Sequence, residues 1–235
     1  MSTKPTIVLV HGAFAESASW NGSIHRLQEQ GYTAIAAANP LRSIASDAAF
    51  VADIVRSTPG PLVLVGHSYG GAIISAAARG HANVTSLVFV SGYAPAEGET
   101  LGDLTGRFPG STLVSNLMSV PLSDGSHDLY IKQDKYHQQF MADVPLAEAM
   151  VDAATQRPLR DVTLTERTGP PAWASIPSWF VYAEFDKNIS AAVHRFMAER
   201  AKARETVEIK GAAHALPVSQ PDAVADLILR AAAHV

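Results

Sequence analysis

The chain has 235 residues, of which 47% are hydrophobic and 17% charged. A chain of this length buries roughly 70–75% of its unfolded surface, so it can fold without disulfide bonds or structural metals. Eighteen basic and 22 acidic residues give a net charge of -4, without the basic block typical of nucleic-acid binding. The absence of cysteine excludes disulfide bonds, a thiol nucleophile and thiolate metal ligands.

The first apolar run, Ile7–Val10, is much shorter than the apolar stretch of a signal peptide. No run reaches the length of about 20 apolar residues that a membrane-spanning helix needs. We therefore expect a cytoplasmic protein, a monomer or homodimer, with no membrane or nucleic-acid partner.

Apolar runs of strand length alternate with amphipathic stretches of helix length. The strand candidates are continuous apolar runs rich in Val, Ile and Phe, which indicates a sheet covered on both faces. In chain order they are Thr6–Val10, Thr33–Ala37, Leu62–Val65, Ser86–Val90, Ser178–Ala183 and Thr206–Ile209. The helix candidates are Ser17–Gln30, Ile44–Ser57, Gly70–Gly80, Ala191–Lys202 and Pro221–Ala233. This order predicts an α/β fold, a three-layer sandwich with a mostly parallel six-stranded sheet.

The alternation stops between Ala94 and Trp173. This segment shows weak helix patterns, frequent Gly and Pro, and no strong strand pattern. Because it is too long for a simple loop, we expect an inserted helical cap over the carboxyl ends of the strands. The predicted core is then residues 1–93 and 174–235, and the predicted cap is residues 94–173.

The motif Gly66-His67-Ser68-Tyr69-Gly70 stands between a predicted buried strand and a predicted helix. In such a sharp turn the glycines avoid backbone collisions, and the serine hydroxyl is exposed at the start of the helix. Free backbone N–H groups there favour a developing negative charge. The strand, turn and helix together predict that Ser68 is a nucleophile.

A serine hydroxyl needs a base, and the base needs an orienting acid. In this architecture the acid and then the histidine follow the serine along the chain. His214 lies in the loop after the predicted strand Thr206–Ile209 and is the predicted base. His194 falls inside a helix pattern, where we expect it on the surface, and His234 lies at the terminus.

Two carboxylates follow the strand Ser178–Ala183. Asp186 stands at the turn itself, and its short side chain matches the usual acid of such a triad, so it is the preferred acid. Glu184, closer to the strand, is the alternative, and Glu97 is a more distant one.

An acyl-transfer site also needs hydrogen-bond donors for the oxyanion. The backbone N–H of Tyr69, directly after the nucleophile, is one candidate. The other is the N–H of Ala13, in the loop after the first strand, where Gly12 permits close approach. His11 and His67 are expected to hold these loops together rather than to bind metal, because no third ligand accompanies them.

These residues together resemble the α/β-hydrolase superfamily. The resemblance rests on His11-Gly12, the Gly66–Gly71 turn, Asp186 and His214, and it covers essentially the whole chain. Within the superfamily, the chain is similar to the compact six-stranded members. These include small bacterial esterases, plant methyl esterases and hydroxynitrile lyases. The resemblance implies a serine esterase without cofactor or metal, acting on a small-molecule ester.

The expected reaction is hydrolysis of a small, fairly apolar carboxylic ester through an acyl-enzyme. Phe14, Tyr93 and Trp173 are the candidate substrate contacts. One alternative is hydroxynitrile lyase or cofactor-free haloperoxidase and perhydrolase chemistry on the same triad. A lyase would need a cationic side chain, for which the cap offers Lys132, Lys135 and Arg107. Another alternative is a ligand sensor with slow turnover.

Overall fold

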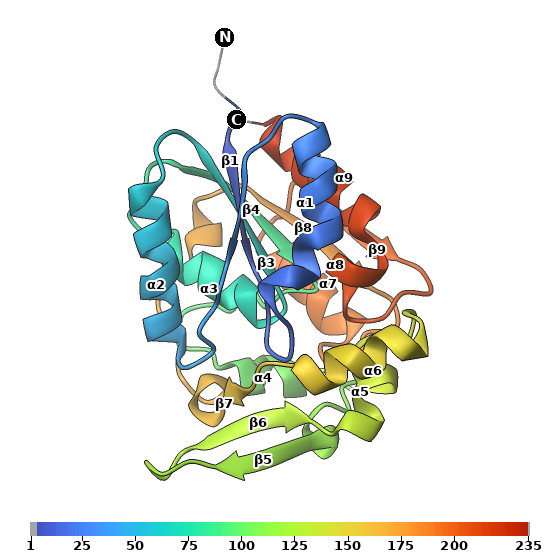
Figure 1. Cartoon of the computed structure of the whole chain (residues 1–235). Coiled ribbons are helices and arrows are strands. Elements are labelled where there is room, and N and C mark those ends of the chain that lie inside the picture. The colour runs from blue at the N-terminus through green and yellow to red at the C-terminus, as the bar shows by residue number, and fades with distance from the viewer. Residues whose placement is uncertain (1–3, 235) are drawn as a thin grey trace.

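The structure, a computed structural model, describes residues 4–234. Its centre is the predicted six-stranded parallel sheet, in which the strands have the order β2-β1-β3-β4-β8-β9 (Figure 1). The strands are β1 (Thr6–Val10), β2 (Ala34–Ala37), β3 (Leu62–His67), β4 (Val84–Val90), β8 (Ser178–Ala183) and β9 (Glu205–Ile209). Every residue of β3 and β8 is buried, which explains why these sequences are continuous apolar runs.

Two hydrophobic cores lie on opposite faces of the sheet. On one face, Val51 of α2 (Ile44–Ser57), Ile73 of α3 (Tyr69–Ala77) and Val193 of α7 (Ala191–Arg200) pack together. On the other, Leu27 of α1 (Asn21–Glu29) packs with residues of α8 (Leu216–Ser219) and α9 (Pro221–Ala232). The predicted three-layer sandwich is therefore confirmed.

The helices are short, and one of them is divided. Between residues 4 and 234 no helix combines the length and apolar character needed to cross a membrane. The stretch predicted as a single helix from residue 17 to 30 begins as a 3-10 helix, Ser17–Trp20, before α1. The helix α2 begins where Ser43 caps it, its hydroxyl accepting the N–H of Ser46 at 3.0 Å.

The strand order places the loops that follow β1 and β3 side by side at the carboxyl ends of the strands. β1 lies between β2 and β3, so the chain leaves the carboxyl ends of β1 and β3 toward opposite faces. Crevices of this kind are where parallel α/β sheets bind ligands. Val10 pairs with Gly66, so the residues that follow each of them meet at this point.

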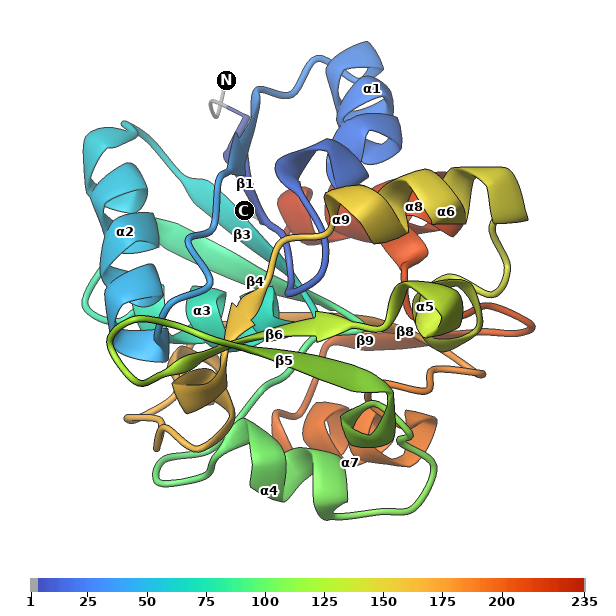
Figure 2. The ribbon, with the colours of Figure 1, turned by 60° about the horizontal axis from the view of Figure 1, so that its bottom comes forward.

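Most of the segment predicted as a cap lies beyond the carboxyl ends of the strands (Figures 1 and 2). Its last residues, from Pro170 on, instead lie beside the end of α3 and Val84, the first residue of β4. It holds the helices α4 (Leu101–Gly106), α5 (Gln133–Phe140) and α6 (Leu146–Thr155), and the short 3-10 helices Val114–Asn116, Asp161–Leu164 and Ala172–Ala174. It also holds a three-stranded antiparallel sheet, with the order β5-β6-β7, that the sequence pattern did not predict. Its strands are β5 (Leu117–Pro121), β6 (His127–Ile131) and β7 (Leu159–Arg160).

Gly70 is the point at which α3 touches the end of β1. A Cβ atom on Gly70 would lie 2.3 Å from the carbonyl oxygen of Val10, a backbone atom that cannot move away cheaply. We expect Gly70→Ala to lower the free energy of unfolding by about 1–3 kcal/mol or more, measured by urea denaturation.

Gly106→Ala is the matched control, because a Cβ atom there would meet nothing within 4 Å. Equal stability of Gly70→Ala and Gly106→Ala would contradict the close contact between β1 and α3.

Candidate active site

Ser68 lies in the turn between β3 and α3 with a backbone conformation that few L-residues adopt. Its φ is 53° and its ψ is -121°. Its N–H donates to the carbonyl oxygen of Val90 at 3.1 Å, and its own carbonyl accepts the N–H groups of Gly71 and Tyr93, both at 3.0 Å. These bonds hold the strained turn and fix Ser68 at the start of a helix, where negative charge is favoured.

Asp186 and His214 are hydrogen-bonded although 28 residues separate them. Nδ1–H of His214 donates to Oδ2 of Asp186 at 2.6 Å, and both side chains are fully buried. The other carboxylate oxygen, Oδ1, accepts the backbone N–H groups of Asn188 at 2.8 Å and Ile189 at 2.9 Å. The loop after β8 thus orients a histidine from the loop after β9, as a triad requires.

The Asp186 carboxylate is ionised despite its burial. Burial by itself raises the pKa of a carboxyl group, but attraction to His214 and hydrogen bonds from His194 and His214 outweigh it. They hold the pKa of Asp186 well below its usual range. An ionised carboxylate only accepts hydrogen bonds, so Nδ1 of His214 carries the proton and Nε2 is left to act as a base.

The hydrogen bond between nucleophile and base is not formed in this structure. Nε2 of His214 is buried and has no partner within residues 4–234. Such bonds are often long until a substrate is in place. The structure therefore brings acid and base together, and it leaves the Nε2 lone pair of His214 unengaged.

Gly12 allows the loop after β1 to approach Ser68 closely. A Cβ atom at Gly12 would lie 2.6 Å from Cβ and 3.3 Å from Oγ of Ser68. The side-chain amide of Asn39 holds this loop by donating to the carbonyl oxygen of His11 at 3.0 Å. Asn39 could not be identified from the sequence, because no sequence pattern shows that β2 ends beside this loop.

The two predicted oxyanion donors are free to donate. In the described part of the chain, neither the N–H of Ala13 nor that of Tyr69 has an assigned acceptor. The N–H of Phe14, the next residue in the loop, donates to the carbonyl oxygen of Arg157 at 3.0 Å. Both residues also line a small space that touches Ser68.

An apolar cavity adjoins Ser68. A small space of about 20 Å³ touches Ser68, Tyr69 and Asn188, and a larger one of about 490 Å³ is lined by residues of α4, by residues 111–115 and by Leu117 of β5. No charged residue lines either space among the described residues. The two spaces share the lining residues Phe14, Leu113, Leu159 and Leu164, so they adjoin.

Two of the three predicted substrate contacts lie at this cavity. Phe14 and Tyr93 line the space beside Ser68. Trp173 does not, and its prediction as a substrate contact needs correction. Its Nε1–H donates to the carbonyl oxygen of Pro95 at 3.0 Å, and the Arg200 guanidinium lies 5.4 Å from its ring centre, so the indole is held elsewhere.

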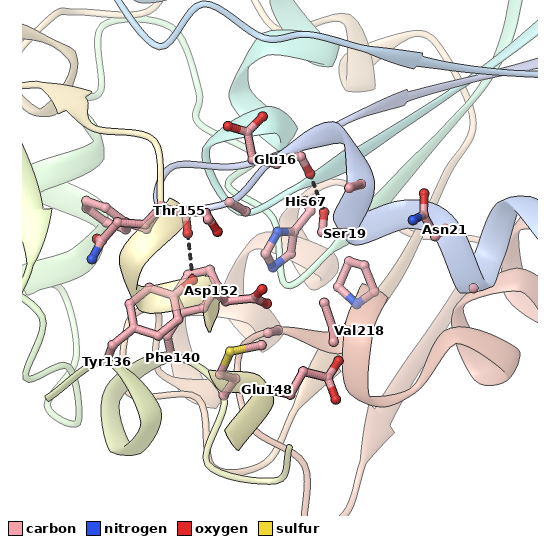
Figure 3. A pocket seen from close by; sticks show the side chains of 18 residues that line it. Glu16, Ser19, Asn21, His67, Tyr136, Phe140, Glu148, Asp152, Thr155 and Val218 are labelled. Carbon is pink, nitrogen blue, oxygen red and sulfur yellow. Dashed lines mark hydrogen bonds between the residues drawn. The ribbon is translucent and has the colours of Figure 1, made fainter. Parts of the chain in front are cut away.

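A second cavity, of about 550 Å³, is lined in part by Phe14 and His67 (Figure 3). It is lined by the carboxylates of Glu16, Glu148 and Asp152, but not by Ser68. Burial, together with the nearby charge of Glu148, raises the pKa of Asp152. Because it is acidic and does not contain Ser68, this cavity is a poor place for a reaction that develops negative charge.

The structure favours Asp186 over the alternative acids. Glu184 is partly exposed and accepts the N–H of Gly211 at 3.0 Å and the Lys210 ammonium at 3.1 Å. Glu97 is exposed. Asp186 alone among the three reaches His214.

His194 is not a surface residue, contrary to the sequence prediction. It is 0% exposed, and its Nε2–H donates to Oδ2 of Asp186 at 3.1 Å. Its helix α7 also carries exposed polar residues, so the helical pattern alone did not show which side His194 occupies.

His11 and His67 support the two loops. Nδ1–H of His11 donates to the carbonyl oxygen of Gly12 at 2.8 Å, and Nε2–H of His67 donates to that of His214 at 3.1 Å. Burial lowers the pKa of His11 to about 4 and that of His67 to about 3, so both rings are neutral. Between residues 4 and 234 no three His, Asp or Glu side chains are arranged to hold a metal ion.

Comparisons with known proteins agree with this architecture. The model of the alpha/beta hydrolase family matches residues 7–227. The chain belongs to this family. It is 26% identical over 262 residues to the esterase PIR7B of Oryza sativa subsp. japonica, covering 98% of this chain and 97% of that one. It is also 26% identical over 250 residues to the alpha/beta hydrolase nvfD of Aspergillus novofumigatus (strain IBT 16806), covering 97% of each.

Solved structures share the fold of this hydrolase over almost its whole length. Polyneuridine aldehyde esterase matches with a TM-score of 0.83 and 18% identity, covering 97% of this chain and 99% of that one. The methylesterase MES16 from Arabidopsis matches with a TM-score of 0.82 and 15% identity, covering 98% and 100%. A pyrethroid hydrolase from Sphingobium faniae JZ-2 matches with a TM-score of 0.76 and 23% identity, covering 98% of each chain.

The buried neutral histidines predict how stability depends on pH. The unfolded chain binds protons on His11 and His67 near pH 6.5, whereas the folded chain does so only near pH 4 and below. Acid therefore favours the unfolded state, and the free energy of unfolding should fall between about pH 6.5 and 4. Each histidine contributes up to about 1.4 kcal/mol per pH unit.

Urea denaturation at several pH values measures this slope. In His11→Gln the slope of the free energy of unfolding against pH should be smaller, because about one proton fewer is taken up on unfolding. His25→Gln changes an exposed position on α1 and should leave the slope unchanged. Equal slopes for the wild type and His11→Gln would contradict a neutral buried His11.

Proposed function

We propose that this hydrolase cleaves small, fairly apolar carboxylic esters through an acyl-enzyme formed on Ser68. The observation that carries the proposal is the hydrogen-bonded Asp186–His214 pair. This pair and the strained Ser68 turn both follow the carboxyl ends of strands of the same parallel sheet. The names of the sequence relative PIR7B, an esterase, and of the structural relatives support ester hydrolysis.

The reaction follows from the positions of these groups. Oγ of Ser68 attacks the acyl carbon, and its proton passes to Nε2 of His214. Asp186 keeps the proton of His214 on Nδ1 and stabilises the imidazolium that forms. The N–H groups of Ala13 and Tyr69 stabilise the oxyanion of the tetrahedral intermediate.

Collapse of the intermediate releases the alcohol, which takes the proton from His214. Water then attacks the acyl-enzyme, and Nε2 of His214 accepts a proton from it. When the second tetrahedral intermediate collapses, His214 returns this proton to Oγ of Ser68 and the carboxylic acid leaves. The chain's own side chains supply every proton transfer in this sequence, so it uses no cofactor.

The cavity supports an uncharged substrate. A charged group moved from water into the space lined by Leu113, Leu159 and Leu164 would lose its hydration and find no counter-charge. The space of about 490 Å³ has the size of a typical small-molecule site. An ester with an apolar acyl or alcohol group matches both properties.

Cyanohydrin cleavage is less well supported, because the cavity offers no cation for cyanide. The Lys132 ammonium donates to the carbonyl oxygen of Ser115, and Lys135 pairs with Asp134. Arg107 pairs with Glu99. None of the three candidate cations lines the spaces at Ser68, and no observation favours perhydrolysis or a ligand sensor over ester hydrolysis.

Substitution of the nucleophile tests the proposal. Ser68→Ala should lower kcat for p-nitrophenyl acetate by at least about 1000-fold, because no other group can form the acyl-enzyme. Ser75→Ala, which removes another buried hydroxyl from α3, should keep near-wild-type activity.

Steady-state kinetics of the two purified variants provide the comparison, with circular dichroism as a check of folding. Retention of more than about one tenth of the wild-type kcat by folded Ser68→Ala would overturn the mechanism.

A further inference from the structure

Two buried imidazoles converge on one oxygen of Asp186. Nδ1 of His214 lies 2.6 Å from Oδ2, and Nε2 of His194 lies 3.1 Å from the same atom. The other oxygen accepts two backbone N–H groups, those of Asn188 and Ile189. Four donors therefore surround the carboxylate, and it cannot rotate without losing one of them.

The protonation of His194 follows from its contacts. An ionised carboxylate only accepts, so the proton that contacts Asp186 is on Nε2 of His194. Nδ1 of His194 is buried and has no partner within residues 4–234, and burial lowers the pKa of this ring. His194 is thus a neutral donor that faces a charged acceptor.

The His194 ring is held firmly in this place. The Tyr182 ring, on β8, stacks against it with 5.3 Å between ring centres and 14° between ring planes. The backbone N–H of His194 donates to the carbonyl oxygen of Ser190 in the first turn of α7. Neither contact involves the substrate cavity, so His194 can act on the reaction only through Asp186.

We propose that His194 is a positioning residue of the active site, which fixes the Asp186 carboxylate and withdraws charge from the oxygen that holds His214. The proposal rests on the Ser68, His214 and Asp186 mechanism given above. An oxygen that shares its charge with one N–H attracts a second N–H less strongly. Asp186 then stabilises the imidazolium of His214 less, and the base stays unprotonated at lower pH.

The surrounding groups do not obscure this effect. Titratable side chains near Asp186 and the two histidines include His67, Tyr93 and Tyr182. Burial lowers the pKa of His67 to about 3 and raises the pKa of both tyrosines, so none of the three changes its charge between pH 5 and 9. Lys187, next to Asp186 in the chain, is exposed.

Two substitutions separate the donor from the ring. His194→Phe keeps an aromatic ring against Tyr182 but has no N–H, whereas His194→Gln has an amide N–H but no ring. The measurement is kcat and KM for p-nitrophenyl acetate from pH 5 to 9, with His25→Phe as a surface control. The melting temperature of each variant is recorded at each pH.

For His194→Phe we expect the acid limb of the kcat profile to move up by about half a pH unit to one unit. The plateau of kcat should fall by about 3- to 10-fold, with KM changed by less than about twofold, because substrate contacts are intact. His194→Gln should keep the wild-type acid limb and most of kcat.

Two results would overturn the proposal. One is a wild-type acid limb and kcat in folded His194→Phe, which would mean that the hydrogen bond has no effect on the reaction. The other is greater damage in His194→Gln than in His194→Phe, which would mean that the ring acts through its packing against Tyr182 and not through its N–H. Failure of the ester-hydrolase mechanism is recognised separately, by activity that survives in Ser68→Ala.

A measurement on the unaltered protein covers the case in which the variants do not fold. Nitrogen-15 NMR of histidine-labelled protein reports the tautomer and titration of each ring. We expect His194 to be neutral with its proton on Nε2 throughout pH 5 to 9. A proton on Nδ1, or titration of His194 in this range, would overturn the proposal.

Discussion

The close approach of the chain after β1 to the turn after β3 is the constraint on which the site depends. Ser68 can hold its strained conformation only because its neighbours place no side-chain atoms in the way. Gly12 faces the serine, and Gly70 faces the end of β1. The same contact brings Ala13 to the small space that Ser68 also lines, so the proposed oxyanion donor depends on the close approach that permits the strained turn.

A buried negative charge is the second requirement. Asp186 is fully desolvated, and such a charge is tolerated only when it is surrounded by donors. Two backbone N–H groups and two imidazoles supply them, from the loop after β8, from α7 and from the loop after β9. The carboxylate therefore ties together three segments distant in sequence, and it orients His214 as a consequence.

Much of this could be predicted from the sequence because the signals are local. The buried strands are continuous apolar runs, and the Ser68 turn has its glycines within two residues. The β5–β6 hairpin was missed because β5 is short and its apolar residues are mostly exposed, so they do not alternate with polar residues as in a half-buried strand. The partners of His194 and Trp173 were missed because they come from other loops, and helical periodicity carries no information about such contacts.

Covalent labelling with a fluorophosphonate tests the central claim most directly. The reagent resembles the tetrahedral intermediate and reacts only with a serine that an adjacent base activates. The account predicts one phosphonyl group per chain, located on Ser68 by mass spectrometry of the digested protein, and loss of ester hydrolysis in proportion to labelling. Inactivation with the label on another residue, or full labelling of Ser68 with activity retained, would contradict it.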